Sequence, residues 1–378
     1  MSIDLDEVRA RLSARGQAAR PAEVADALTW LGYVVSDAAV LETVAALRRE
    51  SQGAGPLDDL LRLPGVTDVL VNGPDEVWVD RGAGLERSGV RFESEEAVRR
   101  LAVRLAALVG RRLDDGAPFV DARLPDGTRV HAVLDCIAGS TCLSLRIPAR
   151  VRFTLAEWVE RGSLTPGGAD VLSALVAGRA ALLVSGGTGS GKTTLLATLL
   201  AEVDARERLV IVEDSRELDP DHPHVVHLEG RTANAERVGS VTLTDLVRNA
   251  LRMRPDRLVV GEVRGAELAD LLAALNTGHE GGCGTVHANS AASVPARLEA
   301  LGALGGLSRH ALHAQAAAGL DAVVHVRRER DGVRFVEQVA VLVPRADGLV
   351  ESLPAVTWSP SGAHERGPGW AALGRWLR

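Results

Sequence analysis

The chain has 378 residues, of which 46% are hydrophobic and 25% are charged, and its formal net charge is −7 at pH 7. This balance excludes a wholly disordered chain, and the length predicts about two domains. The net negative charge and the 3% aromatic content disfavour a protein that binds nucleic acid through a basic, base-stacking surface.

The cysteines and the lengths of the apolar runs indicate in which cellular compartment the chain is expected to lie. Cys136, Cys142 and Cys283 are too few and too irregularly spaced for a disulfide framework, which favours a reducing environment. The first residues lack the basic and apolar regions of a signal peptide. No apolar run approaches the roughly 18 residues that a membrane span needs. We therefore expect a cytoplasmic protein.

The lysine content is unusual. Of the 43 lysine and arginine residues, only Lys192 is a lysine. Arginine can replace lysine wherever a solvated positive charge is sufficient, but it cannot replace a compact ammonium group. We therefore expect Lys192 to have a specific chemical role.

Residues 1–50 are predicted to be a short helical segment. Leu5, Val8 and Leu12 recur at helical spacing. Pro21 stands where a second helix could begin, because proline is favoured in the first turn of a helix. We expect this segment to be a packing cap, and the alternative is a docking element for partners.

Residues 51–147 are predicted to form a smaller α+β domain of PAS-like type. Short strands are expected on either side of a Gly-Pro turn at 72–74. A helix is expected over 95–108, because its apolar residues recur on one face.

From residue 169 the pattern changes to apolar strands that alternate with helices. This alternation predicts a mostly parallel α/β sheet over 169–345. The expected strands include 208–212, 258–260 and 284–287. Residues 148–168 are expected to be a linker with a short helix, and residues 346–378 a loosely packed C-terminal tail.

A phosphate-binding loop is the clearest motif. Residues 186–193 read Gly-Gly-Thr-Gly-Ser-Gly-Lys-Thr and match G-x-x-x-x-G-K-[ST] in full, between an apolar strand and a helix. Backbone N–H groups of such a loop face phosphate oxygens, Lys192 reaches the terminal phosphates, and the Thr193 hydroxyl is expected to bind Mg²⁺. The predicted nucleotide-binding residues are Gly186, Gly187, Thr188, Gly189, Ser190, Gly191, Lys192, Thr193 and Thr194.

Two later strands are predicted to end in glutamates. Ligands bind at the carboxyl ends of strands in open α/β sheets, so both glutamates are candidates for the same site. Glu213 follows the strand over 208–212 and could hold Mg²⁺ through water. Glu262 follows the strand over 258–260 and is the candidate that polarises the attacking water. Thr193, Glu213 and Glu262 are the predicted metal-site residues.

Two histidines follow in a glycine-rich segment. We expect His279 and His287 to sense or contact the γ-phosphate. An alternative interpretation takes His279, Cys283 and His287, four residues apart, as a zinc-binding face of a helix. The intervening glycines disfavour that helix, because each costs about 1 kcal/mol relative to alanine.

These motifs together resemble the type II/IV secretion ATPase superfamily, and most closely its CpaF/TadA-type branch of tight-adherence (Flp) pilus-assembly ATPases. The resemblance spans roughly residues 56–340. It rests on the phosphate loop, the acidic segment 213–217, the strand that ends at Glu262 and the histidine segment 279–287, in that order. The runs LVRNALRMRPDRLVVGEVRG and NTGHEGGCGTVHANS are especially specific.

The resemblance implies a RecA-like ATPase domain that uses ATP and Mg²⁺ within a homo-oligomeric ring, commonly a hexamer. Arginines near a neighbouring subunit would complete the site, and the candidates are Arg123, Arg129, Arg146 and Arg231. The ring would drive an inner-membrane platform protein, and so attach peripherally to the cytoplasmic face of that membrane. No nucleic-acid partner is expected.

Other functions stay open at this point. A nucleic-acid translocase or helicase of related fold would show nucleic-acid-stimulated hydrolysis. A nucleotide-dependent scaffold would bind ATP without hydrolysing it, although intact Lys192, Thr193 and Glu262 argue against this. The arginines of the helix at 95–112 could contact anionic lipid, but a face near the nucleotide is favoured. The transported substrate has no signature in the sequence.

Overall fold

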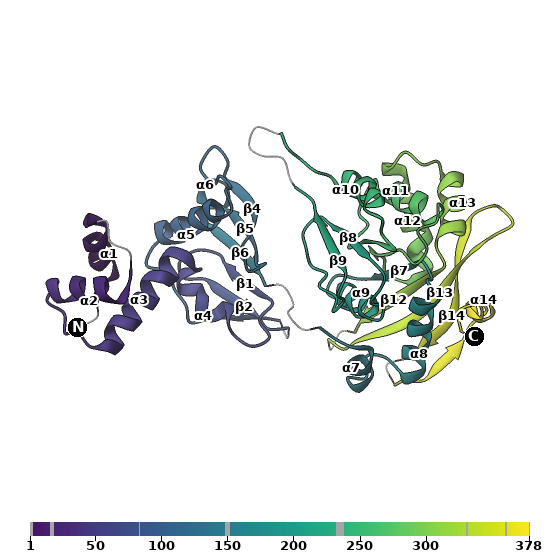
Figure 1. The fold of residues 1–378 in the computed structure, drawn as a ribbon, viewed down its shortest axis with the longest axis horizontal. Coiled ribbons are helices and arrows are strands. Elements are labelled where there is room, and N and C mark those ends of the chain that lie inside the picture. Colours follow the sequence, from purple (N-terminus) through teal and green to yellow (C-terminus); the bar gives the residue numbers. More distant parts are fainter. Residues whose placement is uncertain are drawn as a thin grey trace. The chain divides into compact units, whose positions relative to one another are not determined.

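The chain divides into two compact units, residues 1–149 and residues 150–378 (Figure 1). The computed structural model describes residues 3–15, 19–82, 84–147, 152–231, 238–329, 332–359 and 361–377. Among these residues no helix is both long and apolar enough to cross a membrane.

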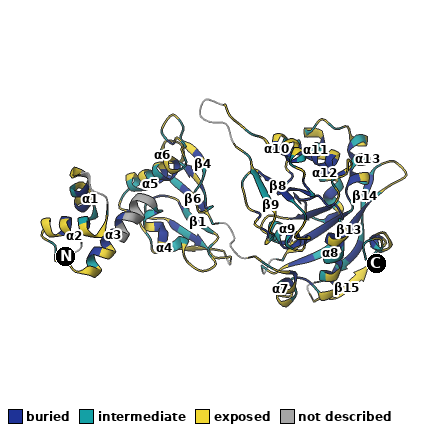
Figure 2. Ribbon diagram, viewed as in Figure 1, coloured by how far each residue is buried: buried dark blue, intermediate teal, exposed yellow. Residues whose placement is uncertain are grey.

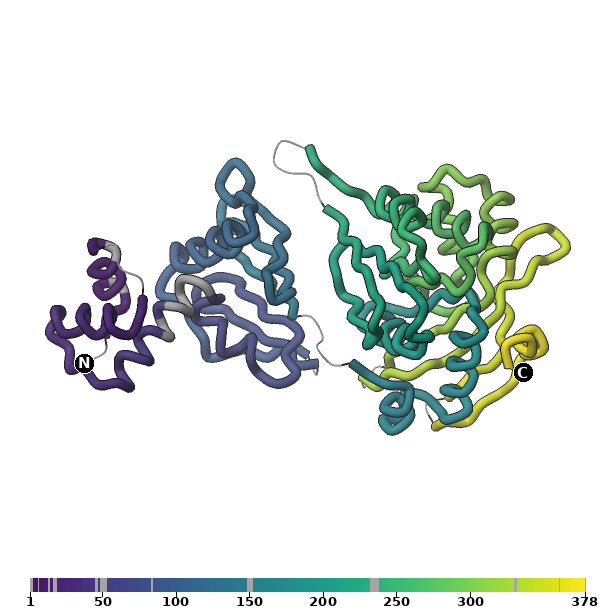
Figure 3. The backbone as a smooth tube through the Cα atoms, viewed as in Figure 1, coloured from purple at the N-terminus to yellow at the C-terminus, as the bar shows by residue number. Residues whose placement is uncertain are grey.

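Three helices form the N-terminal segment, as the purple end of the tube in Figure 3 shows. They are α1 (Leu5–Ala14), α2 (Pro21–Trp30) and α3 (Asp37–Gln52). Val8, Leu12, Val24, Leu28 and Val44 make their small core. Pro21 opens α2, where its missing N–H costs no hydrogen bond. The predicted helices are confirmed.

The rest of the first unit is a six-stranded antiparallel sheet in the order β3-β2-β1-β6-β5-β4. Helix α5 (Glu95–Leu108) packs on one face through Val98, Leu101 and Leu105, and its N-cap Ser94 accepts a hydrogen bond from the Ala97 N–H. The elements besides α5 are η1 (Gly55–Leu57), α4 (Asp58–Leu61), β1 (Asp68–Val71), β2 (Val77–Asp80), β3 (Leu85–Arg87), β4 (Phe119–Arg123), β5 (Arg129–Val133), α6 (Asp135–Ala138) and β6 (Cys142–Arg146).

The second unit is built on a nine-stranded sheet in the order β15-β14-β13-β12-β7-β11-β10-β8-β9. Neighbours from β12 to β9 are parallel, and β13, β14 and β15 extend the sheet antiparallel. The strands are β7 (Leu182–Gly186), β8 (Leu209–Glu213), β9 (Val225–Glu229), β10 (Arg257–Val260), β11 (Cys283–His287), β12 (Ala322–Arg328), β13 (Arg334–Pro344), β14 (Val350–Trp358) and β15 (His364–Arg366).

Helices cover both faces of this sheet, so its central strands are buried throughout (Figure 2). Residues of α7, α8 and α9 pack with one face, and residues of α10 to α13 pack with the other. The helices are α7 (Leu155–Glu160), α8 (Pro166–Ala177), α9 (Lys192–Ala201), α10 (Leu243–Ala250), η2 (Leu251–Met253), α11 (Glu267–Leu275), η3 (Ala291–Ser293), α12 (Val294–Leu304), α13 (Arg309–Gly319) and α14 (Trp370–Leu373). The predicted α/β fold with a mostly parallel sheet is confirmed.

The prediction of a loosely packed tail over 346–378 is wrong. Strand β14 pairs with β13, β15 pairs with β14, and Trp358 and Leu373 lie in the core. Pro354 interrupts the apolar run of β14 and makes it a poor strand candidate by sequence. The structure accommodates this proline beside a register shift, where the pairing passes from Val356 directly to Pro354.

The expected linker over 148–168 is also only partly correct. Its short helix is present as α7, but Leu155 and Trp158 are buried in the core of the second unit. The Trp158 indole donates a hydrogen bond of 3.0 Å to the Thr198 hydroxyl on α9. Residues 152–168 therefore belong to that unit, and residues 148–151 lie outside the described part of the chain.

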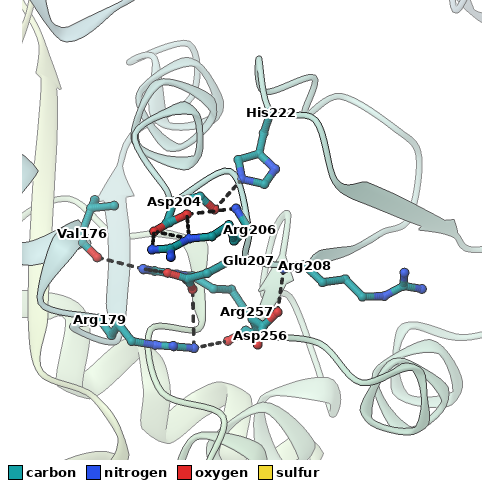
Figure 4. Close-up of polar contacts among 9 residues, drawn as sticks. All are labelled: Val176, Arg179, Asp204, Arg206, Glu207, Arg208, His222, Asp256 and Arg257. Atoms are coloured by element: carbon teal, nitrogen blue, oxygen red, sulfur yellow. Dashed lines mark hydrogen bonds and ion pairs between the residues drawn. The ribbon is translucent and has the colours of Figure 1, made fainter.

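A charged network joins the segments that precede β8 and β10 (Figure 4). Arg257 is 3% exposed, and its guanidinium donates to Glu207 Oε2 at 2.8 Å and to the Val176 carbonyl at 2.9 Å. Arg179 donates to the Asp256 carbonyl and lies 3.4 Å from Glu207. A Cβ at Gly281 would lie 2.9 Å from Arg257 Nη1, so the glycine makes room for this buried charge.

Candidate active site

The phosphate loop occupies the turn between β7 and α9, at the carboxyl edge of the parallel strands. Gly191 is the N-cap of α9 with φ 100°, a conformation that favours glycine. A Cβ at Gly186 would lie 2.4 Å from the Val326 carbonyl oxygen on β12, so no larger residue fits there. The backbone therefore has the geometry that the motif requires.

Lys192 lies folded against its own loop. Its Nζ donates to the Gly187 carbonyl at 2.8 Å and to the Gly186 carbonyl at 3.1 Å. Burial lowers the pKa of Lys192, although the nearby Glu262 carboxylate opposes this shift. The carbonyls thus satisfy a buried ammonium group that can exchange them for phosphate oxygens.

His287 joins Lys192 to Glu262. The end of β11 lies beside the end of β7, with His287 opposite Gly186 in the register. His287 Nδ1 lies 3.4 Å from Lys192 Nζ, and its Nε2 lies 3.1 Å from Glu262 Oε1. Burial and the positive charge of Lys192 lower the pKa of His287. A neutral imidazole is therefore favoured at this position.

Glu262 follows β10 and is ionised in the site. Burial alone would raise its pKa, but a hydrogen bond and the charge of Arg264 outweigh burial, so the pKa is lowered. Arg264 Nη2 lies 2.5 Å from Glu262 Oε2. The structure thus brings together Lys192, Glu262 and His287, and it adds Arg264. Sequence reasoning missed Arg264, although its position two residues after a strand-ending glutamate was a usable signal.

Glu213 ends β8, the neighbour of β10. Its Oε1 accepts hydrogen bonds of 3.0 Å from the N–H groups of Glu217 and Leu218, so it fixes the acidic segment that follows. A Cβ at Gly261 would lie 2.5 Å from Glu213 Cγ. The Gly261-Glu262 pair therefore has a physical reason, since the glycine leaves space for Glu213. The role of Glu213 as a metal ligand stays a prediction.

His279 and His287 lie at opposite ends of β11. His279 precedes the strand, whereas His287 is its last residue, and five strand residues span about 13–17 Å. The structure therefore does not place His279 beside the Lys192–His287–Glu262 cluster. The zinc interpretation is wrong for the same reason, because Cys283 and His287 lie on a strand and not on a helix. Burial also raises the pKa of Cys283 to about 12.

Three of the predicted arginines form a row across the sheet of the first unit. Arg123 lies opposite Arg129, and Arg129 opposite Arg146, on three adjacent strands. Residues directly opposite each other on neighbouring strands have side chains on the same face of the sheet. The next residues along these strands, such as Val130 and Leu145, are buried in the core with α5, so the arginine row lies on the face opposite α5. Arg146 Nε also pairs with Asp68 Oδ1 at 2.9 Å.

Arg231, the fourth candidate, belongs to the second unit. It forms an isolated bridge with Val241, and its Nε donates to the Gly239 carbonyl at 2.6 Å. These bonds place it at the base of the connection between β9 and α10. A role of any of the four arginines in catalysis stays a prediction.

The residues at the loop fit Mg²⁺ bound together with a nucleotide. Thr193 is partly buried in the first turn of α9, Glu213 ends β8, and Glu262 lies two residues beyond the end of β10. Magnesium usually takes one or two protein oxygens and completes its shell with phosphate and water. Among the described residues, no group of three or more His, Cys, Asp and Glu side chains could hold a metal alone.

The chain is similar to known proteins over most of its length. A family model described as "Type II/IV secretion system protein" matches residues 50–337. A Mycobacterium tuberculosis protein named "Putative conjugal transfer protein" is 54% identical over 327 residues, which cover 85% of this chain and 93% of that protein. The Brucella suis "Type IV secretion system protein VirB11" is 33% identical over 285 residues, or 68% of this chain and 78% of that protein.

Solved structures show the same fold. The pilus retraction motor PilT with bound ADP is 21% identical with a TM-score of 0.52, over 77% of this chain and 78% of that one. The Yersinia pseudotuberculosis ATPase DotB is 17% identical with a TM-score of 0.54, over 83% and 81%. The family match spans most of both units. The chain therefore belongs to the type II/IV secretion system protein family, and it is an ATPase of that family.

Proposed function

We propose that the chain is the ATP-hydrolysing motor of a secretion or pilus-assembly machine, working as a homo-oligomeric ring, commonly a hexamer. The observation that carries this proposal is the convergence of Lys192, His287 and Glu262 on the phosphate loop, with separations of 3.4 Å and 3.1 Å. Such an arrangement binds a triphosphate at its base and offers a carboxylate where water would attack.

Each side chain has a distinct part in the proposed mechanism. Loop N–H groups and Lys192 bind the phosphates, and Lys192 leaves the Gly186 and Gly187 carbonyls as it does so. Glu262, held by Arg264, orients the attacking water. The neutral His287 contacts both groups and is placed to respond to the γ-phosphate. Thr193 Oγ1, with Glu213 and Glu262 through water, would hold Mg²⁺, whose charge neutralises phosphate oxygens.

The arginine row supports a site shared between subunits. Arg123, Arg129 and Arg146 lie opposite one another on three adjacent strands, so their guanidinium donors are gathered on one face where they could bind an anion. The anion proposed here is the phosphate group of ATP on a neighbouring subunit. Such arginine fingers raise hydrolysis rates by about 10³–10⁵ in other nucleotide hydrolases.

The partners follow from the relatives' names. The relatives and the similar structure are named for conjugal transfer, type IV secretion and pilus retraction. We infer that this ATPase acts on a membrane platform protein from the cytoplasmic face of the inner membrane. Membership of the CpaF/TadA-type branch remains part of the proposal, and no nucleic-acid partner is included.

Mixing two inactive variants tests the shared site. Glu262→Gln keeps the arginine row, and Arg129→Gln keeps the glutamate. If the row acts on a neighbouring site, random mixing in a ring restores about one quarter of the sites. Each variant alone is expected to be nearly inactive, and the equimolar mixture to regain hydrolysis at concentrations where sedimentation velocity shows rings.

Three outcomes would count against the proposal. A mixture that stays inactive although mixed rings form would remove the arginine row from a neighbour's site. A wild-type chain that hydrolyses ATP fully as a monomer would contradict the shared ring. Hydrolysis that rises strongly on adding single-stranded DNA would favour a nucleic-acid translocase.

A further inference from the structure

We propose that the hairpin of β12 and β13 holds the phosphate loop in its binding conformation. In this proposal Arg334, the first residue of β13, is a positioning residue for nucleotide binding. Arg334 lies far along the chain from the loop and belongs to none of the recognised motifs. The inference rests on nucleotide binding at this loop, as proposed above, and it assigns a role to a part of the sheet outside those motifs.

The first strand of the hairpin runs beside the strand that leads into the loop. β12 pairs in parallel with β7, with His325 opposite Ser185 and Val326 opposite Gly186. The Val326 carbonyl therefore lies against the first glycine of the motif. Beyond this point β12 continues past the loop as Arg327 and Arg328, so the hairpin flanks the loop as well as its strand.

The base of the hairpin is fixed by a buried histidine. His325 is 2% exposed, and its Nδ1 lies 2.9 Å from the hydroxyl of Ser185, the residue just before the loop. The β12–β13 register shifts between His325 and Val326. On the second strand, Glu337 accepts a hydrogen bond of 2.6 Å from Arg327, which holds the two strands together. The hairpin is thus anchored directly behind the phosphate loop.

The return strand contacts the tip of the loop. Arg334 Nε, in the first residue of β13, donates a hydrogen bond of 2.9 Å to the Gly189 carbonyl. The Arg334 Cδ lies 3.8 Å from the position that a Cβ at Gly191 would take. Arg328 Nη1 lies 3.4 Å from the corresponding position at Gly189. Hairpin side chains therefore contact two of the loop's glycine positions.

The contact with Gly189 controls the direction of an N–H group. In a trans peptide the carbonyl oxygen and the next N–H point in opposite directions. Since Arg334 holds the Gly189 carbonyl on the hairpin side, the Ser190 N–H points away from the hairpin and into the loop. There its hydrogen bond to the Gly187 carbonyl is long, at 3.4 Å. An N–H so directed is available to a phosphate oxygen.

The role of Arg334 is therefore to hold the loop in its anion-binding form before nucleotide arrives. Without this hydrogen bond the peptide between Gly189 and Ser190 could rotate, because glycine tolerates both orientations. Binding would then have to order the peptide at the expense of affinity. The hydrogen bond of Arg334 goes to the loop backbone at Gly189, whereas the Glu262 carboxylate is held by Arg264, so the hydrolysis step itself should be little changed.

The test measures nucleotide affinity and kinetics in Arg334→Gln and Arg334→Lys. The control is Arg345→Gln, just beyond the other end of β13, where an exposed arginine pairs with Asp347 at 2.9 Å. We expect Arg334→Gln to raise the Kd for a fluorescent ADP analogue, and the KM for ATP, by roughly fivefold to tenfold through loss of a charged donor. The kcat should stay within about twofold, and Arg334→Lys should recover part of the affinity, because it retains a charged donor.

Several results would overturn the proposal. These are an unchanged Kd and KM in Arg334→Gln, an equal loss in Arg345→Gln, or a fall in kcat at constant KM. An unligated melting temperature equal to that of the wild type separates an affinity loss from misfolding. If the wild type itself fails to bind the analogue, the proposed nucleotide site is refuted. If the wild type binds and Arg334→Gln binds equally well, only the positioning role of Arg334 is refuted.

Discussion

Lys192 illustrates how one side chain can be selected against the composition of the whole chain. Its ammonium group lies within 3.1 Å of two loop carbonyls and near His287, and the residue is only 7% exposed. A guanidinium is planar and larger, and its five donors form a fixed fork. Such a group does not match carbonyls arranged around a point charge.

Replacement of Lys192 is therefore expected to abolish most activity even when the charge is kept. Both Lys192→Ala and Lys192→Arg should lower kcat/KM for ATP by about 10²–10³, the range seen for loss of a preorganised donor. Steady-state hydrolysis measures this change, with the melting temperature as a folding control. A Lys192→Arg variant with near wild-type activity would contradict the point-charge role.

The acid limb of the pH–rate profile should report His287. Its pKa is lowered from the ordinary value of 6.5, so the neutral imidazole persists until the pH falls below that value. Protonation would then pair the imidazolium with Glu262 and occupy the carboxylate that we propose orients the attacking water. We expect kcat to be level from pH 6.5 upward and to fall at lower pH. In His287→Gln this fall should move further into acid, and an unchanged limb would exclude His287 as its cause.

The sequence could predict the residues that a contiguous motif carries, and it could not predict those placed by tertiary contacts. Lys192 and Glu262 follow recognisable strands and His287 ends one, so their convergence at one sheet edge was predictable. Arg334 contacts a loop 145 positions away in the chain. His279 shows the converse limit, because closeness in sequence to His287 did not bring it to the same end of β11.

Among the strands of the second unit, those with continuous apolar runs are predictable from the sequence, and the one that proline interrupts is not. The parallel strands β8, β10 and β11 read as apolar runs and were predicted within a residue of their observed ends. Strand β14 was missed, because Pro354 signals a strand end unless the neighbouring strand provides a bulge. Only the pairing with β13 shows that it does.

The Arg257–Glu207 pair makes a prediction at this scale. Arg257→Ala leaves the Glu207 carboxylate without its closest cation in a nearly dry site, which typically costs about 3–5 kcal/mol of unfolding free energy. Denaturant unfolding of the isolated protein measures this loss. Arg206→Ala, which removes an exposed guanidinium beside Asp204, is the control and should leave stability unchanged. Equal stability of both variants would show that the network does not hold these segments together.

At the scale of the whole molecule, the chain separates phosphate recognition from the arginine row. The phosphate loop, Glu262 and His287 lie in the second unit, whereas Arg123, Arg129 and Arg146 lie in the first. Length predicts about two domains, and the change from short strands around turns to strands that alternate with helices predicts their different classes. These features could not predict how the units cooperate, because that depends on surfaces that only assembly brings together.

The proposed mechanism depends above all on Glu262, which would activate the attacking water at a nucleotide site formed by the phosphate loop. The most direct measurement compares kcat for ATP and the Kd for nucleotide in the wild type and in Glu262→Gln. We expect kcat to fall by about 10²–10⁴, which is typical for loss of a general base, while the Kd stays close to the wild-type value. Wild-type kcat in Glu262→Gln would contradict the account, because another group would then have to activate the water.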